Sequence, residues 1–130
     1  RVRFEVARAK DIGENDFDLV TAFDCLHDMG DPEGCAAHIR SCLKPDGAWL
    51  LCEPIAADEA ADNVGSPVSR LYYNASTMIC VPTSLDQEVG AALGAQAGEA
   101  KLTHVLKAAG FRSVRRATEG PFNMILEARP

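Results

Sequence analysis

The sequence predicts an α/β fold in which helices pack on a mostly parallel β-sheet. Segment 17–54 is the main evidence, because it reads as an apolar strand, a polar loop, a capped helix, a turn and a second apolar strand. Two further strand patterns, at 111–117 and 122–128, close the chain on either side of a Gly-Pro turn. The chain has 130 residues, 47% of them hydrophobic, which suits one domain with a buried core.

The first element expected is a strand at 2–7, where apolar and charged side chains alternate (VRFEVA). A second strand is expected at 18–23, after the polar turn at 13–16. A helix should then begin at Asp31-Pro32-Glu33, since Asp31 can accept hydrogen bonds from free backbone amides and proline suits the first helical position. These signals predict strand, strand, helix.

The helix is expected to end at Lys44-Pro45-Asp46-Gly47, because proline cannot continue a helix and glycine permits a turn. Residues 48–52 (AWLLC) form a continuous apolar run, which is typical of a strand covered on both faces. Residues 55–83 show no regular pattern, and a connection of this length is usually functional or partly helical.

A capping-box pattern at 84–87 predicts a helix that contains Val89 and Leu93. Gly90, Gly94 and Gly98 recur every four residues and would form one flat side of such a helix, suited to close packing. An amphipathic helix is expected at 99–109, closed by Gly110.

The composition excludes several classes of function. A net charge of −6 and a pI near 5.0 argue against a nucleic-acid partner, which needs a clustered basic face. No segment resembles a signal peptide or a membrane span, so we expect a cytoplasmic protein without a membrane partner. The five cysteines include no C-x-x-C pair and match no zinc template, which predicts free thiols in a reducing compartment and no metal site.

Four stretches of the chain resemble the C-terminal half of a class I S-adenosylmethionine-dependent methyltransferase: FDLVTAFDCLHDMGDP at 17–32, LKPDGAWLLCEP at 43–54, AAGF at 108–111 and PFNMILEARP at 121–130. The resemblance covers essentially the whole chain. It implies part of a Rossmann-like, doubly wound sheet of strand order 3-2-1-4-5-7-6, with an antiparallel C-terminal strand. It also implies S-adenosylmethionine as cofactor and methyl transfer to a small-molecule acceptor.

The glycine-rich turn that holds the cofactor in this family would precede Arg1, and no G-x-G-x-G occurs in the chain. We therefore expect residues 1–130 to be the C-terminal part of a catalytic domain, unable to bind the cofactor alone. The strand at 18–23 would then have an unpaired edge. Either residues 2–7 pair with it, or two copies pair edge to edge as a homodimer. The alternative function is accordingly an inactive association module.

His27 lies in a stretch similar to the LHDW-type loop of small-molecule O-methyltransferases, in which the matching histidine is the general base for a substrate hydroxyl. Imidazole suits that role because its ordinary pKa is near neutral pH. The resemblance implies that Glu53, at the end of the next strand, orients His27. Met29 departs from the family's tryptophan, and His27 as a simple pocket wall remains the alternative.

The resemblance also nominates residues that contact the cofactor and the acceptor. Phe23 is a candidate for packing near adenine or for plain core, and Asp28 for approaching the sulfonium or facing solvent. Tyr72 and Tyr73 are candidates for a substrate wall or for closing the core, and Asn123 for pairing with the loop or the substrate. The predicted cofactor contacts are Ala9, Lys10, Phe23, Asp24, Cys25 and Asp28, and the predicted substrate contacts are Tyr72, Tyr73 and Asn123.

Overall fold

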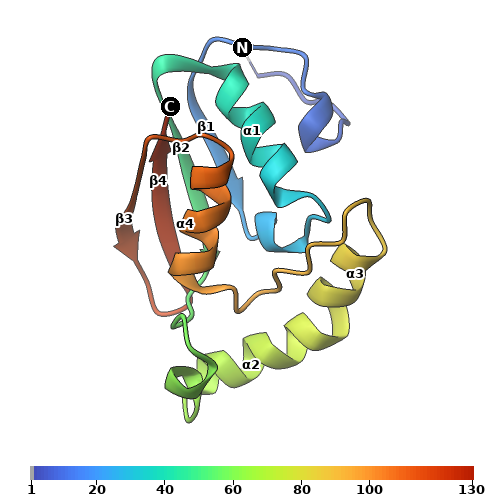
Figure 1. Ribbon diagram of the computed structural model, residues 1–130, viewed down its shortest axis with the longest axis vertical. Coiled ribbons are helices and arrows are strands. Elements are labelled where there is room, and N and C mark those ends of the chain that lie inside the picture. Colours follow the sequence, from blue (N-terminus) through green and yellow to red (C-terminus); the bar gives the residue numbers. More distant parts are fainter. Residues whose placement is uncertain (1) are drawn as a thin grey trace.

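Four strands form one mixed sheet in the computed structural model, which describes residues 2–130. The strands are β1 (Phe17–Phe23), β2 (Leu43–Pro54), β3 (Ser113–Glu119) and β4 (Asn123–Arg129), in the spatial order β1-β2-β4-β3 (Figure 1). β1 and β2 are parallel, and β4 is antiparallel to both of its neighbours. This order matches the 4-5-7-6 end of the expected sheet, so the predicted fold class and antiparallel C-terminal strand are confirmed.

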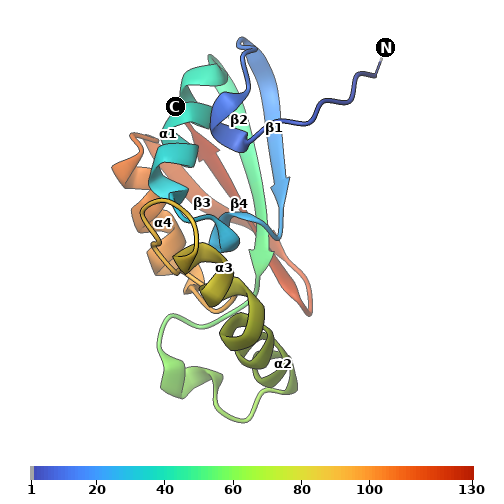
Figure 2. The same cartoon turned by 90° about the vertical axis from the view of Figure 1, so that its right-hand side faces the viewer.

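Helices α1 (Pro32–Cys42) and α4 (Gly98–Ala108) cover one face of the sheet. Figure 2 shows the sheet edge-on, with both helices on the same side. The core lies between the two layers, where Trp49 and Phe111 pack with ring centroids 5.8 Å apart. Asp31 caps α1 as predicted, accepting from the amide of Gly34 at 2.9 Å.

β2 begins at Leu43, directly after α1, so the turn predicted at 44–47 lies inside the strand. Its register against β1 shifts between Phe17, opposite Leu43, and Leu19, opposite Ala48. The extra residues therefore form an irregularity in the ladder. Gly47 is needed there, because a Cβ at this position would lie 2.8 Å from the carbonyl oxygen of Phe17.

The strand predicted at 2–7 is wrong. These residues form no strand, and Val2, Phe4 and Val6 are exposed (78, 93 and 107%). The apolar side chains of an alternating strand are buried only when the strand joins a sheet. No strand within residues 2–130 pairs with the outer edge of β1, so residues 2–7 have not joined this one. The expected pairing of 2–7 with β1 is therefore also wrong. The chain instead reaches a short 3₁₀ helix, η1 (Ala9–Asp11), packed on α1.

The connection after β2 is mostly helical. A 3₁₀ turn, η3 (Ala60–Asn63), precedes α2 (Pro67–Ala75), and α2 continues through the π-helical turn η4 (Ser76–Cys80) into α3 (Val81–Leu85). Ser66 caps α2 by accepting from the amide of Ser69, with Pro67 at the first position. This run lies beside the sheet edge where β1 and β2 end (Figure 1).

The helix predicted after the capping-box pattern is wrong, because no helix forms between Leu85 and Gly98. Val89, Gly90, Ala92 and Gly94 all have positive φ, which an α-helix forbids. The Ser84 hydroxyl instead accepts from the amide of Ala92 and donates to the carbonyl of Met29. No helix within residues 2–130 has both the length and the apolar character needed to cross a membrane.

Candidate active site

Polar side chains meet at the edge of the sheet where β1 and β2 end and antiparallel β4 begins. Asn123 stands opposite Pro54 in the β2–β4 ladder. Its amide donates to Asp24 Oδ1 at 2.6 Å. Asp24 is held there with a φ of 46°, and its own amide donates to the carbonyl of Cys52. The structure thus brings the predicted residues Asp24 and Asn123 together at this rim.

His27 and Glu53 form a buried pair at the same rim. His27 lies in the 3₁₀ turn η2 (Leu26–Asp28) and is 4% exposed, and Glu53 is 1% exposed. One oxygen of Glu53 accepts from His27 Nδ1, and the other accepts from the amide of Leu26 at 2.9 Å. A carboxylate only accepts hydrogen bonds, so the ring proton lies on Nδ1 and the lone pair of neutral His27 lies on Nε2.

Neighbouring charges control the pKa of His27. Burial of the ring acts to lower this pKa, because desolvation disfavours the imidazolium. The hydrogen bond and charge of Glu53, followed by the charges of Asp28 and Asp24, outweigh burial and raise it above its usual value. The rim is therefore an environment that stabilises a proton on His27.

A segment distant in sequence, 84–94, which we call the strap, closes over η2. Gly94 donates its amide to the carbonyl of His27, and Gln87 accepts from the amide of Gly30 at 2.9 Å. Gly30 allows this approach, because a Cβ at that position would lie 2.5 Å from the carbonyl oxygen of Glu88. The capping-box residues Ser84 and Gln87 are thus strap residues that local sequence patterns do not reveal.

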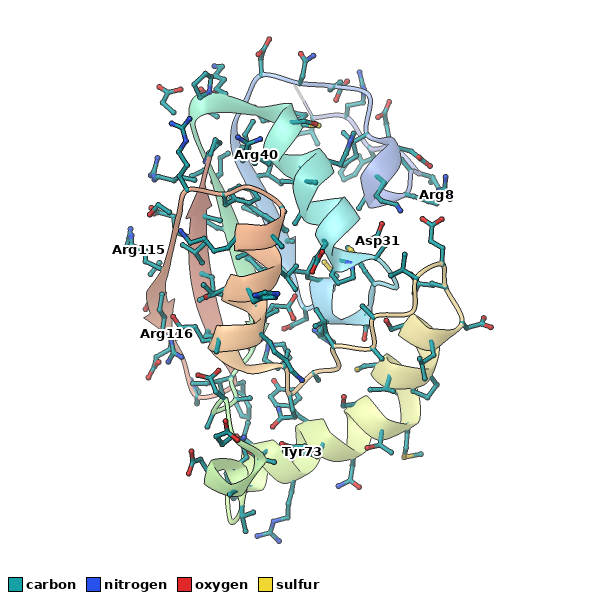
Figure 3. All side chains as sticks on the ribbon, in the orientation of Figure 1. Arg8, Asp31, Arg40, Tyr73, Arg115 and Arg116 are labelled. Atoms are coloured by element: carbon teal, nitrogen blue, oxygen red, sulfur yellow. The ribbon has the colours of Figure 1, made fainter. Side chains whose placement is uncertain are left out.

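The predicted cofactor residues Ala9 and Lys10 line a cleft of about 240 Å³. Met29 and Cys35 line its apolar side, and the strap supplies its far wall. Lys10 Nζ lies 2.8 Å from Asp31 Oδ2 and also pairs with Glu88 of the strap. Figure 3 shows Asp31 at the start of α1, beside this cleft.

Three other predicted cofactor residues lie at the end of β1 or shortly after it. Phe23 is 67% exposed, so the alternative that it is plain core is wrong. Cys25 is half-buried, and burial, followed by the charge of Glu53, raises the pKa of its thiol. Asp28 turns toward the histidine, with Oδ1 3.3 Å from His27 Nε2.

The two predicted tyrosines lie in different surroundings on α2. Tyr72 is half-buried, and burial followed by the charge of Asp24 raises the pKa of its hydroxyl. Tyr73 is 38% exposed and lines a separate cleft of about 550 Å³ with Asn63 and Arg70 (Figure 3). The structure does not bring Tyr73 to the rim.

Cys80 is a rim residue that no sequence pattern indicates. It ends η4, and burial followed by the neighbouring Asp28 carboxylate raises the pKa of its thiol to about 11. No spacing signal connects it with η2, because 52 positions separate Cys80 from Asp28, the last residue of η2, in the printed sequence. Only the path of α2, η4 and α3 over the rim brings it there.

Comparison with known proteins finds one matching family model and several similar solved structures. Residues 3–115 match the family model described as a methyltransferase domain. Human N-acetylserotonin methyltransferase in complex with SAM is a similar solved structure, with a TM-score of 0.68, 22% identity, and coverage of 97% of this chain and 33% of that one. PigF with SAH has a TM-score of 0.67 and 16% identity, covering 94% of this chain and 33% of the other.

A third similar structure is an O-methyltransferase family protein from Burkholderia thailandensis, with a TM-score of 0.64, 22% identity, and coverage of 97% of this chain and 35% of that one. The chain thus spans about a third of the length of these structures. No curated protein sequence matches the chain. At these identities the likeness to solved structures establishes the fold.

Proposed function

The chain belongs to the methyltransferase domain family. We propose that it supplies the general base for methyl transfer from S-adenosylmethionine to a hydroxyl of a small-molecule acceptor. The buried pair of His27 and Glu53 is the observation that carries this proposal. The printed names of two similar structures mention SAM or SAH, which supports the choice of cofactor.

The cleft at Ala9 and Lys10 fits the adenine end of this cofactor. Ala9, Met29 and Cys35 offer apolar walls for a flat base, while Lys10 and Gln87 supply polar groups, a composition typical of ligand sites. When bound, S-adenosylmethionine supplies a methyl group that its sulfonium makes electrophilic. Along the path from this cleft to the rim, we assign cofactor contacts to Phe23, Asp24, Cys25 and Asp28.

In the proposed step, His27 Nε2 accepts the proton of the acceptor hydroxyl. Glu53 keeps the other ring proton on Nδ1, so that Nε2 presents its lone pair, and it then stabilises the imidazolium that forms. Asn123, which donates to Asp24, and the half-buried Tyr72 orient the acceptor by hydrogen bonds. Holding acceptor and methyl donor in line contributes further to the rate.

Replacement of His27 tests this proposal in the protein that carries this chain. We expect His27→Ala to lower turnover about a hundredfold or more, the range for loss of a general base. Transfer of labelled methyl from S-adenosylmethionine is the measurement. His104→Ala is the control, because His104 is exposed on α4 and should leave turnover unchanged. A loss of only about threefold for His27→Ala, well below the general-base range, would make His27 a pocket wall.

A second function, self-association, is favoured by one specific observation. β1 is one of the two terminal strands of the sheet, and within residues 2–130 no strand pairs with its outer edge. An exposed strand edge offers free backbone donors and acceptors to another chain. We propose that two copies of the chain pair through β1.

A further inference from the structure

Three side chains that bind metals in many proteins converge beside the rim. One ligand atom each from His27, Asp28 and Cys80 lie within 4.8 Å of one another. His27 and Asp28 come from η2, whereas Cys80 comes from η4, which the chain folds over η2. Within residues 2–130 this is the one group of at least three histidine, cysteine or acidic side chains that lie so close.

A second observation distinguishes this cluster from ordinary polar packing. Although 37% of the Asp28 side chain is exposed, its Oδ1 atom is buried and, while His27 is neutral, accepts no hydrogen bond within the described residues. Buried oxygens without partners are costly, and a bound cation removes that cost. Oδ1 lies 3.3 Å from His27 Nε2, so with neutral His27 two acceptor atoms face each other with no proton between them.

The geometry of the pair suits a tetrahedral ion. Zinc bonds to nitrogen and oxygen of about 2.0–2.1 Å, at a tetrahedral angle, hold the two ligand atoms about 3.3 Å apart. The distance between His27 Nε2 and Asp28 Oδ1 is 3.3 Å. Glu53 also holds His27 through Nδ1, and a carboxylate behind the liganding histidine is the usual support at zinc sites.

We propose that His27, Asp28 and Cys80 bind Zn²⁺ through Nε2, Oδ1 and Sγ, with a fourth position open to water. The thiolate and the carboxylate together balance the charge of the ion, which suits a largely buried site. Binding releases the thiol proton of Cys80 to solvent. The site differs from C-x-x-C templates because its three ligands come from two segments.

Occupation by zinc has a consequence for the rim. The ion takes the Nε2 lone pair, so His27 cannot then accept a proton from an acceptor hydroxyl. Zinc is therefore an inhibitor of the methyl transfer proposed above, and this consequence rests on that proposal. The binding itself does not depend on it, because cofactor and acceptor take no part.

Cobalt titration of the 130-residue chain, freed of metal and kept reduced, tests the site. Co²⁺ replaces Zn²⁺ in tetrahedral sites, and a thiolate ligand gives a charge-transfer absorption. We expect one Co²⁺ bound with this absorption, and release of the Co²⁺ by added Zn²⁺. Cys80→Ser should abolish the absorption and weaken binding about tenfold or more.

Cys42→Ser is the matched control, because Cys42 is another buried cysteine beside a histidine, with Sγ 3.5 Å from His38 Nε2. This variant should keep the absorption. The proposal would be overturned if the wild-type chain showed no thiolate absorption, or if Cys80→Ser kept it. X-ray absorption of the wild-type zinc complex needs no variant: a sulfur neighbour at about 2.3 Å supports the site. Nitrogen and oxygen neighbours alone would refute it.

Discussion

Glu53 uses both carboxylate oxygens, one on His27 Nδ1 and one on the amide of Leu26. In Glu53→Gln one amide oxygen can still accept from Leu26, whereas the amide NH₂ would donate to Nδ1. The ring proton would then move to Nε2, and His27 could no longer accept a proton from an acceptor. At the residue scale, the proposed function makes Glu53 a positioning residue that acts through His27.

Val89 is a single residue under backbone strain. It is a β-branched residue with a φ of 72°, and 78% of it is exposed, so its side chain adds little packing. Strain of this kind costs about 1–3 kcal/mol. We expect Val89→Gly to raise the free energy of unfolding by about 1 kcal/mol, measured by urea denaturation.

Ala91→Gly is the matched control, because Ala91 is also exposed in the strap but has an ordinary φ. It should destabilise the chain by about 0.5–1 kcal/mol, since glycine only makes the unfolded chain more flexible. Equal destabilisation by both changes would contradict strain at Val89.

At the element scale, the start of α1 depends on Asp31. Its carboxylate caps the helix and pairs with Lys10, and that hydrogen bond, followed by the one from the Gly34 amide, lowers the pKa of Asp31. Asp31→Ala should lower the free energy of unfolding by about 1 kcal/mol. Asp31→Asn keeps the cap but loses the ion pair, so its loss should be smaller.

The pH dependence of these losses follows from the sign of the pKa shift. Because the pKa of Asp31 is lower in the folded chain, its charge stabilises the fold above the unfolded value of about 3.9. The difference in the free energy of unfolding between wild type and Asp31→Asn should have its largest value above that pH. It should shrink as the pH falls through the lowered pKa, as urea denaturation at several pH values would show. A difference independent of pH would exclude the ion pair as its source.

Elements with complete local signals could be predicted from the sequence. α1 has its cap and proline, α4 has an apolar stripe closed by Gly110, and a Gly-Pro turn separates β3 from β4. The strap could not be predicted, because Ser84 and Gln87 satisfy backbone groups of the distant η2 loop instead of a local helix.

The same reasoning applies to the site. His27 follows β1 and Glu53 lies at the end of β2, and because β1 and β2 are parallel neighbours, their meeting at one rim follows from topology and was predicted. Cys80 arrives on a helical run whose direction no local pattern specifies. Tyr73 was predicted to contact the substrate together with Tyr72. Neighbouring residues on a helix point in different directions, however, and Tyr73 lines another cleft.

At the scale of the whole molecule, the sheet is open, and within residues 2–130 the outer edges of its two terminal strands, β1 and β3, are unpaired. Val20 and Ala22 of β1 pack toward the core, while Leu19 and Phe23 on the opposite face are exposed. Within residues 2–130, α1 and α4 cover one face of the sheet, and both lie on the same side of it in Figure 2. The unpaired edge of β1 and the apolar residues beside it favour association.

Analytical ultracentrifugation tests this association. We expect the wild-type chain to dimerise with rising concentration, and Leu19→Lys to weaken the dimer, because charge on an edge strand opposes pairing. Leu85→Lys, on α3 and equally exposed (59% against 52%), should leave the dimer unchanged. A wild-type chain that stays monomeric at all concentrations would contradict pairing through β1.

The most direct test of the central claim is a double-mutant cycle on His27 and Glu53, measured as turnover in methyl transfer by the protein that carries this chain. If the pair acts as one base, Glu53→Gln and His27→Ala each lower turnover about a hundredfold or more. The double variant should then be no slower than His27→Ala alone, since Glu53 acts only through the imidazole. Independent effects that multiply in the double variant would contradict the account.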